Sequence, residues 1–235
     1  MKLKKTARLA GLIYFILIIS GIFNLMYIPS KLIVWNNAVK TIENITQSEQ
    51  LFRFGILSGI ICFSCFLILP LILYKLLHHI NKTYAMLMVL FAVVSVPISF
   101  VTMLHHFSVL TLIGNEPFLE GLDKVQLQTE IMLHLSYFFD GVQIAQIFWG
   151  LWLLPFGYLV FKSNFLPKFF GIFLMIGCFG YLIEFFGSLL FNDYSKNIIS
   201  DFVGIPASIG EIGICLWLLI VGVREKNTEK SDIEI

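Results

Sequence analysis

The chain has 235 residues, of which 58% are hydrophobic and only 13% carry a formal charge, and its mean hydropathy is +0.87. A soluble domain has about 25% charged and about 45–50% apolar residues. This composition excludes a soluble globular enzyme, a disordered chain and a disulfide-rich secreted domain. A net charge of only +1 also excludes a basic nucleic-acid-binding protein. The composition indicates an integral membrane protein in a lipid bilayer.

Six stretches of the chain contain almost no charged residues and are long enough to cross a bilayer, which takes about 20 helical residues. We expect transmembrane helices at about residues 8–28, 52–76, 84–107, 132–160, 167–191 and 201–223. These stretches are continuously apolar, which favours helices over the alternating pattern of transmembrane strands. The sequence therefore predicts an all-α fold: a polytopic six-helix transmembrane bundle that forms one domain over residues 1–223, with a polar cytoplasmic tail at 224–235.

The distribution of basic residues predicts the orientation of this bundle. Eleven of the 16 Lys and Arg residues lie at the two chain ends or in the second and fourth turns between helices. Lys and Arg accumulate on the cytoplasmic side of membrane proteins. We therefore expect both termini to face the cytoplasm, with two long loops, at about 29–51 and 108–131, on the outer side.

Three carboxylates lie inside the predicted spans, where ionisable residues are costly and are functional candidates by default. Glu211 shares a helix face with small residues, so it should point into the bundle near the middle of the bilayer. Glu184 also lies among small residues, and Asp140 shares a face with Gln143. Glu184 and Glu211 could instead only hydrogen-bond neighbouring helices as neutral acids, and Asp140 could lie at the wet interface.

Further polar side chains collect in the outer half of the predicted bundle. Asn24 lies in the first helix, Arg53 begins the second, and the candidate metal ligands His105, His106 and His134 flank the long outer loop. These histidines could also be ordinary interfacial residues, because no His-x-x-x-His spacing is present. Together the polar groups predict an outward-facing polar pocket. A proton, a metal ion or Arg53 could balance a carboxylate buried in that pocket.

Several short motifs, spread over nearly the whole chain, resemble a known family. They are RLAGLIY at 8–14, LFRFG at 51–55, Gly150, GYL at 157–159, LP at 166–167, GYLI at 180–183, GE at 210–211 and LWLL at 216–219. In this order and spacing they resemble the bacterial domain-of-unknown-function family numbered 4386, from about residue 6 to 223. The resemblance implies a six-helix membrane protein in the bacterial cytoplasmic membrane, and it implies no activity or cofactor. It places Arg53 and Glu211 within recognisable motifs.

Three classes of function are compatible with this sequence. The first is a protein that binds or moves a small molecule or a lipid through the polar pocket, using Glu211, Glu184 and Asp140. The second is a non-catalytic membrane partner or assembly factor. The third is a membrane-embedded metal-dependent hydrolase that uses the outer histidines. The sequence favours the first class and leaves the ligand, any cofactor and the oligomeric state open.

Overall fold

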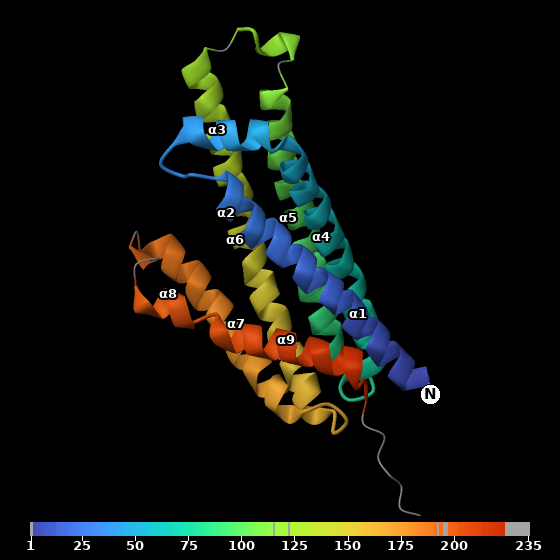
Figure 1. Ribbon diagram of the computed structural model, residues 1–235. Helices are drawn as coiled ribbons and strands as arrows, with labels where there is room; N and C mark the ends of the chain where they lie inside the picture. Colours follow the sequence, from blue (N-terminus) through green and yellow to red (C-terminus); the bar gives the residue numbers. More distant parts are fainter. Residues whose placement is uncertain (1, 115, 122, 192, 195–196, 224–235) are drawn as a thin grey trace, which may run out of the picture.

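A computed structural model describes residues 2–114, 116–121, 123–191, 193–194 and 197–223, and over these residues the chain contains helices and no strands (Figure 1). The all-α prediction is confirmed, whereas the predicted tail at 224–235 lies outside the described residues. The long helices are α1 (Lys2–Ile22), α4 (Glu49–Leu77), α5 (Lys82–Ile113), α6 (Lys124–Lys162), α7 (Lys168–Leu190) and α9 (Ile205–Ile220). The shorter elements are a π-helical segment (Phe23–Tyr27), α2 (Ile28–Leu32), α3 (Ala38–Gln47), a 3-10 turn (Pro117–Leu119) and α8 (Ile198–Phe202).

Six of the helical stretches are long and apolar enough to cross a membrane, which confirms the six-helix membrane fold. They are Leu3–Leu32, Glu49–Leu77, Lys82–Ile113, Lys124–Lys162, Lys168–Leu190 and Ile198–Ile220. The first continues from α1 through the π-helical segment into α2, and the last combines α8 with α9. The chain is therefore a multi-pass membrane protein.

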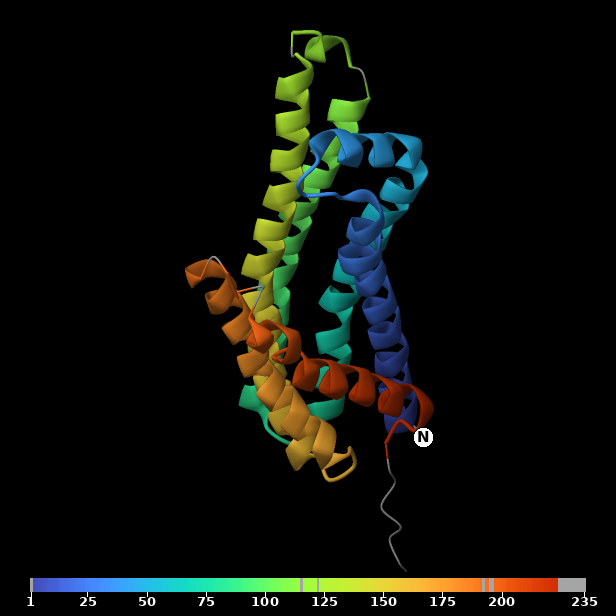
Figure 2. The same cartoon turned by 60° about the vertical axis from the view of Figure 1, so that its left-hand side comes forward.

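Two of these helices extend well past the apolar segments predicted at 84–107 and 132–160. Helix α5 continues to Ile113, and α6 begins at Lys124, directly after an N-terminal capping box. In this box the Asp123 side chain accepts a hydrogen bond from the Gln126 backbone, and the Gln126 side chain accepts one from the Asp123 backbone. Hydropathy detects only the part of a helix that contacts lipid, so it misses such polar extensions. The α5–α6 hairpin consequently projects beyond α3, which lies across the outer end of the bundle (Figures 1 and 2).

The six long helices pack in a ring that follows the order of the chain. Each packs against the next, from α1 to α4, α5, α6, α7 and α9, and α9 returns to pack against α1. The Arg8 guanidinium donates a hydrogen bond to the carbonyl oxygen of Ile220, at 3.1 Å, so the beginning of α1 and the end of α9 lie together. The first helix thus begins and the last helix ends on the same side of the bundle, as an even number of crossings requires.

Glycines allow the backbones of neighbouring helices in this ring to touch. A Cβ atom on Gly11 of α1 would overlap the backbone nitrogen of Leu219 in α9. A Cβ on Gly177 of α7 would lie 2.7 Å from the Cα of Ala207, also in α9. In a membrane, apolar side chains gain little by leaving lipid for another helix. Helices therefore associate through close van der Waals packing, which small residues allow. Helix α9 is therefore clamped between α1 and α7.

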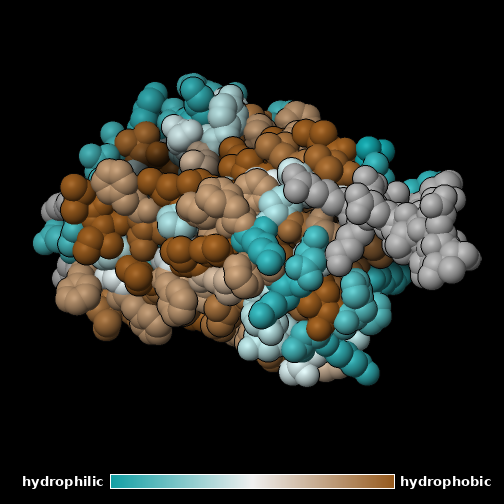
Figure 3. Space-filling model, turned by 90° about the horizontal axis from the view of Figure 1, so that it is seen from below, coloured by the Kyte–Doolittle hydropathy of each residue, from teal (hydrophilic) through white to brown (hydrophobic). Residues whose placement is uncertain are grey.

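The outer surface of the bundle is suited to lipid. Large apolar side chains are exposed along the outward face of every long helix, including Leu57 on α4, Leu90 on α5 and Phe179 on α7. Figure 3 views the molecule from the side on which α1 begins and α9 ends, and broad apolar areas there separate a few hydrophilic patches. An apolar surface of this extent is stable only against hydrocarbon, so it indicates a bilayer environment.

Replacing Gly11 by alanine should destabilise the bundle, because the added methyl group would overlap the α9 backbone at Leu219. We expect the free energy of unfolding to fall by about 1–3 kcal/mol, the usual cost of forcing extra atoms into a packed interior. The matched control is Gly204→Ala, since a Cβ there meets no atom within 4 Å. Both variants can be compared with the parent by denaturant unfolding in detergent micelles. Equal stability of Gly11→Ala and the parent would contradict the α1–α9 contact.

Candidate functional site

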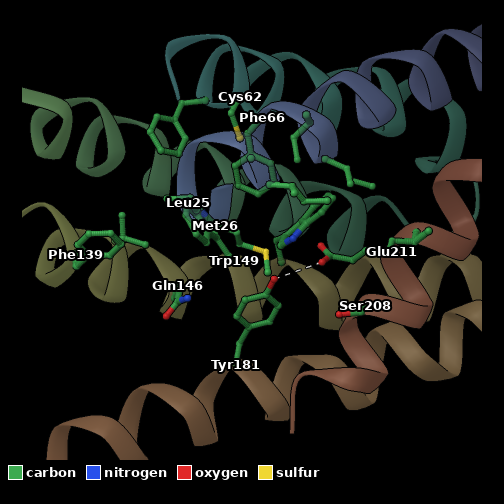
Figure 4. A pocket seen from close by; sticks show the side chains of 18 residues that line it. Leu25, Met26, Cys62, Phe66, Phe139, Gln146, Trp149, Tyr181, Ser208 and Glu211 are labelled. Atoms are coloured by element: carbon green, nitrogen blue, oxygen red, sulfur yellow. Dashed lines mark hydrogen bonds between the residues drawn. The ribbon is translucent and has the colours of Figure 1, made fainter. Parts of the chain in front are cut away.

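A cavity of about 590 Å³ lies inside the ring, between α1, α4, α6, α7 and α9 (Figure 4). Its lining is mostly aliphatic and aromatic. The polar groups in the lining are few and come from α6, α7 and α9: Gln146, Tyr181, Ser208 and Glu211. The structure therefore brings one of the three predicted carboxylates, Glu211, into a ligand-sized space.

Glu211 accepts hydrogen bonds from tyrosines on the two helices that flank α9. The Tyr14 hydroxyl, on α1, donates to Oε1 at 3.1 Å, and the Tyr181 hydroxyl, on α7, donates to Oε2 at 3.4 Å. Tyr14 is only 1% exposed and lies behind the carboxyl group, whereas Tyr181 also lines the cavity. Figure 4 shows the Tyr181 hydroxyl pointing at Glu211 across the cavity. Each carboxylate oxygen retains a further lone pair for a ligand.

The same helix contacts that clamp α9 place these three side chains. Tyr14 follows Gly11 by three residues, so both lie on the face of α1 that meets α9. Gly210, directly before Glu211, packs so closely on α7 that a Cβ would lie 2.8 Å from the backbone nitrogen of Leu174. Sequence reasoning missed both tyrosines as partners. A signal was present, since Tyr14 and Tyr181 lie within motifs at 8–14 and 180–183 that also characterise the family resemblance.

The carboxyl group lies on α9, which crosses the bundle at a steep angle to the long helices α5 and α6 (Figures 1 and 2). Glu211 is nine residues from Ile220, which the Arg8 hydrogen bond places beside the beginning of α1. At a rise of about 1.5 Å per residue, this corresponds to about 14 Å along α9. Glu211 therefore lies inside the bundle, where the side chains that line the cavity around it are mostly apolar.

The cavity extends from Glu211 toward the end of the bundle that carries the α5–α6 hairpin. Its walls include residues between 17 and 26 on the first span and between 139 and 152 on α6. Over 13 residues of α6, this is about 20 Å of helix. Trp152 packs edge-on against Tyr14, with ring centroids 6.1 Å apart, so the Trp152 end of this wall is the Glu211 end. The site is a long apolar slot with its hydrogen-bonding groups toward the inner end.

Arg53 and Asn24 do not line this cavity. Arg53 forms an ion pair with Glu49, at 2.7 Å, in the first turns of α4, and both side chains are about half exposed. Asn24 lies in the π-helical segment, is 1% exposed, and fits against Gly59, where a Cβ would lie 2.8 Å from its amide nitrogen. Neither polar atom of Asn24 has a hydrogen-bond partner among the described residues. The structure thus gives Glu211 no counter-charge from Arg53.

The other two candidate carboxylates also lie outside the cavity lining. Glu184 accepts a hydrogen bond from the Tyr194 hydroxyl, at 3.3 Å, close to the outer end of α7. Burial, together with the negative charge of Glu184, raises the pKa of this tyrosine above its ordinary value, which keeps the hydroxyl a donor. Asp140 is exposed on α6, and Gln143 is partly buried one turn later. The three carboxylates therefore belong to three separate environments.

Two of the three candidate histidines meet at the α5–α6 interface. The Nδ1 atoms of His105 and His134 are 3.0 Å apart, a hydrogen-bond distance. His106 points elsewhere, is 3% exposed, and stacks on Phe138 with ring centroids 3.7 Å apart. Among the described residues, no three His, Cys, Asp or Glu side chains come together as ligands for one metal ion. A metal at the His105–His134 pair would need water or another molecule to complete its coordination.

Comparison with known proteins assigns the chain to a family but to no activity. The family model described as "Domain of unknown function (DUF4386)" matches residues 9–222. An uncharacterized protein from Archaeoglobus fulgidus is 30% identical over 150 residues, which cover 64% of this chain and 72% of the relative. No solved structure matches the chain. Since the family match covers all six spans almost completely, the chain belongs to the DUF4386 family of multi-pass membrane proteins.

Proposed function

We propose that this protein binds an amphiphilic small molecule or lipid in the cavity between α1, α6 and α9. The apolar chain of the ligand occupies the slot between α1 and α6, and its polar group reaches Glu211. The observation that carries this proposal is a carboxyl group inside the helical bundle, at one end of an otherwise largely apolar cavity. A volume of about 590 Å³ lies within the range of about 300–1,000 Å³ that is usual for ligand pockets.

The cavity extends to the lipid-facing surface of the bundle, which gives a ligand a route in from the bilayer. Ile22, Met26 and Ile212 line the cavity and are nevertheless 46%, 66% and 45% exposed. All three lie on spanning helices, so their exposed parts contact lipid. A hydrophobic molecule can therefore reach Glu211 sideways from the membrane without crossing an aqueous phase.

Below Glu211 the ring is closed. Leu73 of α4, Phe156 of α6 and Leu218 of α9 are fully buried in the core cluster that fills the inner half of the bundle. This conformation is therefore suited to holding a ligand from the outer half of the membrane. Moving that ligand to the inner side requires a second conformation, in which this core opens.

The cellular location that we propose is the bacterial cytoplasmic membrane, with both termini inside. Lys and Arg residues concentrate on the side of the bundle that carries both ends, including Lys75, Lys82, Lys162 and Lys168 at the inner ends of helices. This bias is the usual determinant of orientation. The α5–α6 hairpin and α3 then face the outer side.

Filling the slot should block ligand binding. Ile18 lines the cavity, whereas Ile19, the next residue, is 53% exposed and does not line it. We expect Ile18→Trp to weaken the saturable binding of dodecanol at least tenfold, because the indole occupies the space of the alkyl chain. Ile19→Trp should bind as the parent does. The measurement is a titration of dodecanol into the protein in lipid nanodiscs, followed by tryptophan fluorescence, and equal affinities for both variants would refute the proposed site.

The orientation can be tested by labelling single cysteines in intact cells. The four native cysteines, which all lie in spanning helices, are first replaced by alanine. Gly121→Cys, in the outer hairpin tip, should then react with a membrane-impermeant maleimide, because a side chain there meets no atom within 4 Å. His79→Cys, in the exposed turn between α4 and α5, should react only after the membrane is opened. The reverse labelling pattern would place the termini outside.

A further inference from the structure

Within the part of the chain that the structure describes, the carboxyl group of Glu211 has no positively charged partner. Among the described residues that line the cavity, none is Lys, Arg or His. The one basic residue that sequence analysis offered, Arg53, is paired with Glu49. A charge held in a medium of low dielectric constant is strongly unfavourable unless it is compensated. The cavity therefore contains an acidic group, and the described residues of its lining include no basic side chain that could form an ion pair with it.

Two tyrosine hydroxyl groups donate hydrogen bonds to this carboxyl group, an arrangement suited to an ionised acceptor. Tyr14 and Tyr181 each donate a hydroxyl hydrogen bond, one to each oxygen. Hydrogen bonds to an ionised acceptor are shorter and stronger than those to a neutral one. They orient Glu211 and favour its carboxylate form, but they bring no charge. A cation that enters the cavity would complete the arrangement.

Several aromatic rings line the cavity that Glu211 enters. Phe66 packs edge-on against both Trp149 and Trp152, with ring centroids 6.5 and 5.1 Å away. Phe63 adds a further ring, 6.2 Å from Trp149, and Tyr181 closes the other side of the cavity. Figure 4 shows Phe66, Trp149 and Tyr181 around the space that Glu211 enters. Aromatic faces attract organic ammonium groups, most strongly where water is excluded.

From this combination we infer that the ligand is a cationic amphiphile with a single ammonium group and no acidic group. This inference rests on the proposed function and specifies the chemistry of the ligand's polar end. The ammonium group lies between the Glu211 carboxylate and the aromatic rings, and the alkyl chain follows the α1–α6 slot toward the outer side. A phosphate or sulfate group is disfavoured, because it would meet Glu211 and no basic residue in the described lining.

The test compares headgroups on one alkyl chain. Dodecyltrimethylammonium, dodecanol and dodecyl sulfate, each below its micellar concentration, are titrated into the protein in nanodiscs made from uncharged lipid. We expect the ammonium compound to bind at least tenfold more tightly than dodecanol, and the sulfate to bind most weakly. Glu211→Gln should abolish this preference and leave the binding of dodecanol nearly unchanged. Glu211→Asp, which keeps the charge, should retain part of the preference.

The matched control is Glu184→Gln. Glu184 is also a membrane-embedded glutamate that accepts a tyrosine hydrogen bond, but it does not line the cavity, so the headgroup preference should survive this change. If Glu211→Gln and Glu184→Gln behave alike, or if the parent binds dodecanol as tightly as the ammonium compound, the inference of a cationic ligand is wrong. In either case, loss of dodecanol binding in Ile18→Trp would still support the cavity. If Ile18→Trp also has no effect, the proposed function itself fails.

Discussion

The arrangement of the whole site depends on backbone contact between α9 and its two neighbours. In a bilayer, apolar side chains gain nothing by leaving lipid for another helix, so close van der Waals packing decides which helices associate. Gly11 of α1 and Gly177 of α7 have no side chain, and a Cβ atom at either position would hold α9 farther away. The resulting approach brings hydroxyl groups from both neighbours to one carboxyl group on α9. The same helix contacts thus produce both the close packing of α9 and the hydrogen bonds to Glu211.

A carboxyl group in this position is useful only if the space around it discriminates between ligands. The buried core below Glu211 excludes water from the inner side, and the aromatic walls above it offer faces without hydrogen-bonding groups. Such surroundings strengthen every electrostatic interaction within them. In the proposed function, this one charge would distinguish an ammonium headgroup from a neutral or an anionic one, and the apolar slot would accommodate the chain.

The sequence predicted the six helices well because composition alone determines whether a segment can cross a bilayer. It also predicted that Glu211 faces inward, since small residues share its face. It could not predict which neighbouring side chains meet at the centre of the ring. Periodicity gives the face of one helix, whereas the positions of Tyr14 and Tyr181 depend on how three helices cross. For the same reason it grouped Glu184 and Asp140 with Glu211, although the structure places them in separate surroundings.

The two ends of the cavity differ in the helical geometry and hydrogen bonding of their walls. At the inner end, Glu211 is fixed by two hydrogen bonds and by close helix contacts on both sides. At the outer end, the wall contains the π-helical segment Phe23–Tyr27, which contributes Leu25 and Met26 to the cavity and Asn24 to the α4 side. π-Helical turns are intrinsically less stable than α-helix and often occur at functional sites. Asn24 is buried in this turn, and its side-chain amide has no hydrogen-bond partner among the described residues. In the proposed function, the headgroup of the ligand would therefore meet the hydrogen-bonded carboxyl group at one end of the cavity, and its chain would lie along the π-helical wall at the other.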